Sequence, residues 1–172
     1  MKVAAILPCY KTSAHILPLL EKFGEEVDHI IVIDDACPEE TGKLVKAKCK
    51  DRRVTVLVHE ENRGVGAAVK TGYAEAMKLG CDILVKVDGD GQMDPAHIGE
   101  LIKPIQRGEA DYTKGNRFYQ PEGLETMPPK RLFANALHSF LSKLSTGYWQ
   151  IFDPANGFTA IHASGSRAAT RA

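Results

Sequence analysis

Short apolar runs alternate with helical patterns along most of this chain of 172 residues, and this alternation restricts the possible fold more than any other feature. The runs have the length and β-branched character of buried strands, and the segments between them carry apolar residues at helical spacing. The predicted strands are residues 2–7, 29–33, 54–58, 83–87, 112–115 and 158–161, and the predicted helices are residues 13–23, 64–79, 95–106 and 130–145. Such alternation favours an α/β fold with a mostly parallel sheet flanked by helices.

Composition is that of one ordinary globular domain. Hydrophobic residues make up 44% and charged residues 26% of the chain, no linker is visible up to about Gly115, and no internal repeat or low-complexity segment is visible. We expect the domain to cover residues 1–162, and residues 163–172, which lack a core pattern, to be an unstructured tail, a truncation point or a cloning remnant. Lys and Arg total 22, as do Asp and Glu, so the chain lacks the basic excess of a generic nucleic-acid binder.

The four cysteines are too far apart to form a CxxC pair, which argues against a zinc ribbon. We expect reduced, mostly buried thiols in a cytosolic protein. No signal-peptide pattern is visible, and no segment approaches the roughly 20 apolar residues of a membrane helix. These features predict a cytoplasmic location.

Polar or glycine-rich residues follow five of the predicted strands. In a parallel α/β sheet the ligand binds beyond the carboxyl ends of the strands, so these segments are expected to form one cleft. They are Pro8-Cys9-Tyr10, Asp34-Asp35, Asn62-Arg63-Gly64-Val65-Gly66, Asp88-Gly89-Asp90-Gly91-Gln92 and Gly115-Asn116-Arg117.

Asp88 and Asp90 are two residues apart after an apolar run, so their side chains are expected to point the same way. Two neighbouring carboxylates repel each other and favour a cation. Mg²⁺ and Mn²⁺ take oxygen ligands and fill their remaining positions with phosphate oxygens and water. The pattern predicts a metal–diphosphate site; the alternative is a solvated acidic turn, since Asp and Gly are common turn residues.

Three residues at the other strand ends each allow two interpretations. Asp34 and Asp35 either cap the next helix or accept hydrogen bonds from a nucleobase or a ribose hydroxyl. Tyr10 is either an aromatic residue at the rim of the cleft or a platform on which a base stacks.

The remaining candidates are glycines and arginines. Gly64 and Gly66 allow a helix to begin close to a ligand, although a dinucleotide fingerprint would need a third glycine. Arg63 either binds phosphate or is an ordinary surface residue. Arg117 and Arg131 flank a proline-containing loop, where together they would hold an anionic acceptor and singly each would be a solvated charge.

Six motifs, in their order along residues 2 to about 162, resemble those of the inverting family 2 glycosyltransferases. The likeness is greatest to the polyprenyl-phosphate sugar transferases of the dolichyl-phosphate mannose type. The motifs are Leu7-Pro8-Cys9-Tyr10, Val32-Ile33-Asp34-Asp35, Asn62 to Ala68, Asp88 to Gln92, Gly115-Asn116-Arg117 and Asp153 to Phe158.

This resemblance implies a GT-A fold, a UDP- or GDP-sugar donor, a Mg²⁺ or Mn²⁺ ion and a polyprenyl phosphate acceptor. It places Pro8 and Tyr10 in the nucleobase pocket and Asp35, with Asp34 beside it, at the base or ribose. It also implies the following roles: metal and diphosphate binding for Asp88, Asp90 and Gln92, acceptor-phosphate binding for Arg117 and Arg131, and an acidic group near the reaction centre for Asp153.

The chain departs from the family at two places. Lys11-Thr12 replaces a frequent Asn-Glu, so a nucleotide-contacting acid is missing, and the chain stops soon after Gly157-Phe158. A saccharide hydroxyl acceptor, with Asp153 as general base, and a truncated, non-catalytic nucleotide-sugar-binding relative therefore stay as alternatives. A receiver domain is a weaker rival, because its Asp pair should follow the first strand.

Residues 116–145 are expected to contact the inner face of a membrane peripherally. Four apolar residues form one face of the predicted helix: Phe133, Leu137, Phe140 and Leu141. The alternative, which is the commoner use of such a face, is packing against the sheet.

Overall fold

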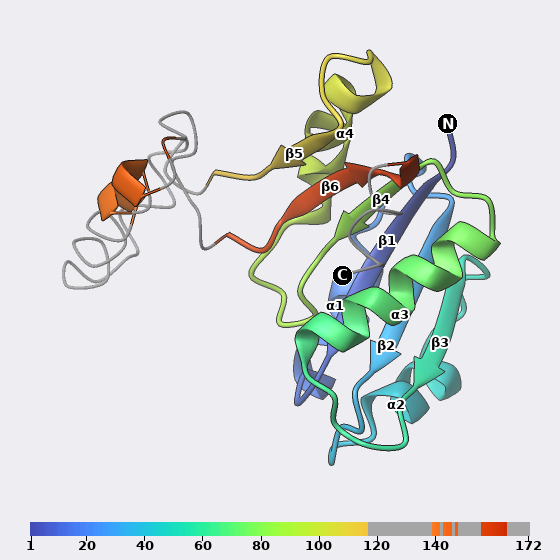
Figure 1. Ribbon diagram of the computed structural model, residues 1–172. Coiled ribbons are helices and arrows are strands. Elements are labelled where there is room, and N and C mark those ends of the chain that lie inside the picture. Colours follow the sequence, from blue (N-terminus) through green and yellow to red (C-terminus); the bar gives the residue numbers. More distant parts are fainter. Residues whose placement is uncertain (117–138, 142, 146, 148–155, 165–172) are drawn as a thin grey trace. The chain divides into compact units, whose positions relative to one another are not determined.

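The computed structural model describes residues 1–116, 139–141, 143–145, 147 and 156–164. The chain divides into two compact units, Met1–Thr113 with Phe158–Ala172, and Lys114–Gly157. The first unit contains the sheet and is shown with its labelled elements in Figure 1.

The described residues form a six-stranded sheet in the order β3-β2-β1-β4-β6-β5. Its strands are β1 (Val3–Cys9), β2 (His29–Asp34), β3 (Val54–Val58), β4 (Ile83–Lys86), β5 (Tyr112–Lys114) and β6 (Thr159–His162). β1 pairs in parallel with both β2 and β4, and β2 pairs in parallel with β3. β6 runs antiparallel to β4. The sheet is therefore mostly parallel, as the alternation of strands and helices predicts.

Helices cover both faces of this sheet (Figure 1). They are α1 (Ser13–Leu20), α2 (Thr41–Lys48), α3 (Val65–Lys78) and α4 (Ile98–Gln106), the last preceded by a 3₁₀ turn, η1 (Pro95–His97). The apolar residues of α1, α2 and α4 share a core with one face of the sheet, and those of α3 pack on the other. β1 is buried along its whole length, because successive side chains alternate between these two cores.

α3 lies unusually close to the sheet at Gly72. A Cβ atom at this position would lie 2.5 Å from Ile6 Cγ2 and 2.8 Å from Ile33 Cδ1. A glycine therefore lets the helix backbone approach β1 and β2, and this places the beginning of α3 beside the carboxyl ends of these strands.

The structure differs from the predicted elements in two respects. α2 was not predicted, because Thr41–Lys48 is largely polar and buries only Thr41, Gly42 and Val45. The antiparallel direction of β6 was not predicted either, since periodicity within a short strand carries no information about its partner. The other boundaries differ by a few residues at most, apart from the predicted helix 130–145.

Most of that helix and the loop before it lie outside the described residues. Residues 139–141 and 143–145, at its carboxyl end, are helical. Within the described part of the chain, no helix is both long enough and apolar enough to cross a membrane. All four cysteines are free; Cys49 is partly exposed, and the buried ones are Cys9, Cys37 and Cys81.

Candidate active site

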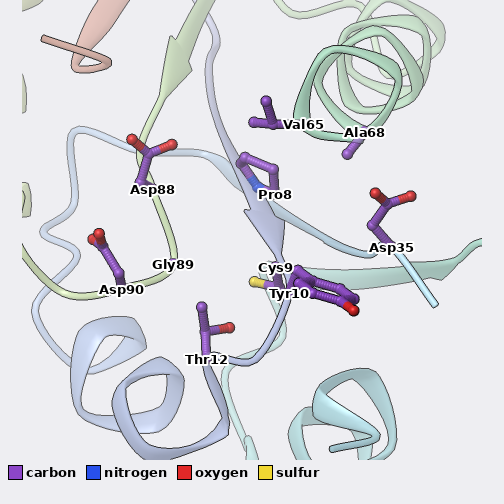
Figure 2. A pocket seen from close by; sticks show the side chains of 10 residues that line it. All are labelled: Pro8, Cys9, Tyr10, Thr12, Asp35, Val65, Ala68, Asp88, Gly89 and Asp90. Atoms are coloured by element: carbon purple, nitrogen blue, oxygen red, sulfur yellow. The ribbon is translucent and has the colours of Figure 1, made fainter. Parts of the chain in front are cut away.

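A hollow of about 170 Å³ lies at the carboxyl ends of β1 and β4 and the beginning of α3. Figure 2 shows Asp88 and Asp90 on one side of it and Asp35 on the other, with Pro8 and Tyr10 between them. All five are residues that the sequence predicts at a ligand site. The remaining lining residues are Cys9, Thr12, Val65, Ala68 and Gly89.

Asp35 is held by a network of hydrogen bonds from the loop that precedes α3. Its Oδ1 accepts from the backbone N–H of Arg63 at 3.0 Å, and its Oδ2 accepts from that of Gly64 at 2.7 Å. Burial by itself raises the pKa of Asp35, but hydrogen bonds from the Arg63 backbone, the His59 side chain and the Gly64 backbone outweigh it and lower the pKa. Asp35 is therefore an ionised carboxylate with a fixed orientation.

His59 extends this network to α3, and the sequence analysis did not identify it. Its Nδ1 lies 2.7 Å from Asp35 Oδ1 and its Nε2 lies 2.9 Å from Thr71 Oγ1. An ionised carboxylate only accepts hydrogen bonds, so Nδ1 is the donor. The one sequence signal for this role is the position of His59 directly after a predicted strand.

Asp34 has a different environment from its neighbour. Its Oδ1 accepts from the backbone N–H of Cys37 at 2.7 Å, and its Oδ2 accepts from that of Gly42 in the first turn of α2 at 2.6 Å. The bond from Gly42 satisfies a backbone N–H in the first turn of α2, which agrees with the capping interpretation, although the N-cap residue itself is Glu40. Asp34 does not line the hollow, and a ligand contact for it stays a prediction.

Gly64 turns the chain into α3. Its φ of +81° lies in the left-handed region that glycine adopts without strain. A Cβ atom at Gly66 would meet nothing within 4 Å, so packing does not require a glycine there. Arg63 is on the surface, with its side chain 59% exposed and its Nε 3.7 Å from Glu61 Oε1.

The Asp88–Gln92 loop packs against the end of β1. A Cβ atom at Gly89 would lie 2.8 Å from Cys9 Sγ and 3.3 Å from the carbonyl oxygen of Pro8. Asp88 Oδ1 accepts from Lys86 Nζ at 2.5 Å, and Asp90 Oδ1 accepts from the backbone N–H of Gln92 at 3.0 Å. Gln92 itself is exposed and does not line the hollow.

Two further lining residues of the hollow, Cys9 and Thr12, differ in chemistry. Burial raises the pKa of Cys9 to about 12, so its thiol stays protonated near neutral pH and is a poor nucleophile. Thr12 is buried, with 8% of its surface exposed.

Three predicted site residues, Arg117, Arg131 and Asp153, lie outside the described residues.

Comparisons with known proteins agree with this arrangement. The sequence profile described as Glycosyl transferase family 2 matches residues 4–168. The chain belongs to glycosyl transferase family 2. It is 31% identical to the UDP-N-acetylglucosamine–dolichyl-phosphate N-acetylglucosaminyltransferase of Methanococcus voltae, over 92% of this chain and 68% of that protein. It is 30% identical to the polyprenol monophosphomannose synthase of Mycolicibacterium smegmatis, over 77% of this chain and 50% of that protein.

A solved structure similar to this family 2 domain is glucosyl-3-phosphoglycerate synthase from Mycobacterium tuberculosis, in complex with Mn²⁺, UDP and glucosyl-3-phosphoglycerate. The TM-score is 0.70 at 18% identity, over 95% of this chain and 57% of that one. This likeness shows the GT-A fold. The glycosyltransferase chain thus spans about half to two thirds of the length of these three proteins.

The residues of this family 2 domain fit a divalent cation that is bound partly by protein carboxylates and partly by a phosphate group. Asp88 and Asp90 supply carboxylate oxygens at the wall of the hollow. Among the described residues, no group of three or more His, Cys, Asp or Glu side chains is placed to hold a metal ion. The other ligands would have to be water, phosphate or amide oxygens, which Mg²⁺ and Mn²⁺ accept readily.

Proposed function

We propose that this chain is the catalytic part, residues 1–162, of a metal-dependent inverting glycosyltransferase that moves a sugar from a nucleotide-diphospho-sugar to a polyprenyl phosphate. The observation that carries the proposal is the hollow itself. It has an ionised Asp35 on one side, the Asp88–Asp90 pair on the other, and the aromatic ring of Tyr10 between them. These two sides suit the two ends of a nucleoside diphosphate.

The nucleoside is proposed to bind at Pro8, Tyr10 and Asp35. Tyr10 is 46% exposed and offers an aromatic face for stacking on a base. Asp35 Oδ2 accepts the Gly64 N–H, and a carboxylate oxygen has two lone pairs, so it has capacity for a ligand donor. UDP and GDP both carry suitable N–H and hydroxyl groups.

The diphosphate is proposed to bind on the side of Asp88 and Asp90, where Gln92 follows. These residues would hold Mg²⁺ or Mn²⁺, which when bound stabilises the charge that develops on the leaving diphosphate. α3 begins beside the hollow with Val65, and a helix N-terminus favours an anion.

The acceptor is proposed to be a polyprenyl phosphate, because the two relatives described above are named for dolichyl or polyprenol phosphate chemistry. The acceptor oxygen bonds to the anomeric carbon as the bond from that carbon to the diphosphate breaks. A phosphate oxygen is already anionic near neutral pH and needs no strong base. Arg117 and Arg131 are proposed to position it; Asp153 would act as a base if the acceptor were a hydroxyl.

A lipid acceptor implies contact with the membrane surface, and we propose a cytoplasmic protein bound peripherally at the inner face. The described part of the second unit exposes three large apolar side chains: Phe140, Leu141 and Leu144, each more than half exposed. Liposome flotation of the chain with polyprenyl-phosphate-doped vesicles tests this contact, and a protein that stays at the bottom of the gradient contradicts it.

A transfer assay tests the function. Purified protein is incubated with UDP- and GDP-sugars, with Mn²⁺ or with EDTA, and with either undecaprenyl phosphate or a saccharide acceptor. We expect metal-dependent transfer to the lipid phosphate only. Transfer to the saccharide would replace the proposed acceptor, and nucleotide binding without turnover on either acceptor would favour a non-catalytic binding relative.

A further inference from the structure

Lys86 forms an ion pair with one of the two carboxylates that line the hollow. Its Nζ donates to Asp88 Oδ1 at 2.5 Å, and the Lys86 and Asp88 side chains are 17% and 32% exposed. The ammonium group thus lies one hydrogen bond away from an oxygen at the wall of the hollow. This residue was not among those that the sequence identified.

The position of Lys86 in the sheet explains why the pair forms. Lys86 is the last residue of β4, between Ile6 of β1 and Thr159 of β6. By the alternation of the strand, its side chain lies on the face of Leu84, which is the face that α3 covers. A mostly buried ammonium group is costly without a nearby anion, and Asp88 provides one.

The same carboxylate cannot serve Lys86 and a divalent cation equally well. A cation at Asp88 would face the positive charge of Lys86, and like charges at this distance repel. An ammonium group on a flexible four-carbon stem has an alternative partner if a phosphate group binds beside Asp88.

We infer that Lys86 is a diphosphate-binding residue that couples the binding of the cation to that of the nucleotide. Without a nucleotide, Lys86 competes with the cation for Asp88. With a diphosphate in the hollow, the ammonium group transfers to a phosphate oxygen and leaves Asp88 to the cation. This inference rests on the proposed function, because it requires a nucleoside diphosphate at this site.

The inference predicts opposite changes in two separate affinities when Lys86 is replaced by Met, which keeps an unbranched apolar stem. Mn²⁺ alone binds about tenfold more tightly, because its competitor is gone. UDP or GDP in EDTA binds about tenfold more weakly, because the ammonium partner is lost. Both changes are of a size typical of coupled binding sites.

The experiment measures Mn²⁺ binding by the loss of the free Mn²⁺ signal in electron paramagnetic resonance, and UDP and GDP binding by calorimetry in EDTA. Lys70→Met, which removes an exposed lysine from α3, is the matched control for loss of one positive charge and leaves both affinities within about twofold. Circular dichroism melts establish that each variant is folded, and Lys86→Gln replaces Lys86→Met if that variant does not fold.

The possible outcomes separate the inference from the proposed function. Opposite shifts in Lys86→Met alone support the inference. Unchanged affinities, shifts in the same direction, or equal shifts in Lys70→Met overturn it while the wild-type protein still binds Mn²⁺ with UDP or GDP. A wild-type protein that binds neither nucleotide, with or without Mn²⁺, overturns the proposed function and the inference with it.

Discussion

The two sides of the hollow are built differently. Asp35, on one side, is 3% exposed and accepts hydrogen bonds from two backbone N–H groups and from His59. Asp88 and Asp90, on the other side, are half-buried; Asp88 accepts from Lys86 and Asp90 accepts from the backbone of Gln92, each two residues away along the chain. Asp35 therefore belongs to the folded scaffold, whereas the Asp88–Asp90 pair has carboxylate oxygens to offer a ligand.

Because of this difference, we expect changes at Asp35 to affect mainly the stability of the domain and changes at Asp90 to affect mainly ligand binding. A change at Asp35 removes the acceptor of three partly buried donors that lie 24 to 29 positions away along the chain, so it affects the whole domain. A change at Asp90 removes one acceptor from a local turn, so it affects only what binds there. Substitution by alanine should therefore lower the free energy of unfolding at Asp35 and the metal-dependent nucleotide affinity at Asp90.

The largest effect is expected for Asp35→Ala. Asp35→Ala removes the acceptor of the His59 side chain and of the Arg63 and Gly64 backbone N–H groups, of which, within the described part of the chain, only that of Gly64 keeps another acceptor, Asn62 Oδ1. The free energy of unfolding should fall by about 3 kcal/mol, since a lost acceptor that joins several parts of the chain is costly. Urea denaturation measures it.

Asp34→Ala is the matched comparison: it leaves the backbone N–H groups of Cys37 and Gly42 without their acceptor and should cost about 2 kcal/mol. Equal losses in the two variants would show that the additional bond from His59 to Asp35 adds nothing to stability.

Asp90→Ala should spare the fold and abolish metal-dependent binding. We expect the free energy of unfolding to change by no more than about 0.5 kcal/mol, as for most surface substitutions. Mn²⁺-dependent affinity for UDP or GDP should fall by about 100-fold, because even indirect support of a metal ligand is worth 10- to 100-fold. Calorimetry with and without Mn²⁺ measures this loss, and an undiminished Mn²⁺-dependent affinity would contradict a metal site here.

The strands were predictable because buried β-branched runs leave a direct mark on the sequence. Other features depend on residues far apart in the chain. Asp34 and Asp35 are adjacent and chemically identical, and their side chains follow the alternation of β2 to opposite faces of the sheet. Which face α2 covers, and therefore which aspartate meets α2 and which meets the hollow, depends on the tertiary fold. His59 contacts Asp35 and Thr71 across 24 and 12 positions, so its place directly after a strand does not by itself reveal its partners.

The sequence also predicts the position of some residues on the other side of the hollow and not of others. Asp88 and Asp90 were predictable, because their spacing after a strand suffices to place both carboxylates at the sheet edge. Lys86 was not, because a lysine at a strand end is ordinarily a solvated charge. Its importance comes from β1 and β6 on either side, which bury it next to Asp88.

Acid should weaken the protein in part by protonating Asp35, and the substitution Asp35→Asn removes this contribution. The pKa of Asp35 is lowered in the folded protein, so its contribution to stability is present above the ordinary aspartate pKa of about 4. It is lost as the pH falls from there through the folded-state pKa. Urea midpoints measured between pH 7 and 3 should therefore fall less steeply for Asp35→Asn than for the wild type, and parallel curves would show that other carboxylates dominate the acid response.

Arg63 lies in the loop that precedes α3 and binds Asp35 through its backbone only. Replacing its side chain should change stability and nucleotide binding less than any of the other substitutions. Its backbone N–H binds Asp35, but its side chain is 59% exposed and lies 3.7 Å from Glu61. Because an exposed ion pair contributes little, Arg63→Met should leave the free energy of unfolding within about 0.5 kcal/mol of the wild type. It should weaken UDP or GDP binding by no more than about threefold, as expected for a solvent-exposed charge near the diphosphate.

A loss of tenfold or more, without a change in stability, would mean that the guanidinium group binds the diphosphate directly. The diphosphate would then contact the Asp35 side of the hollow as well as the side of Asp88 and Asp90.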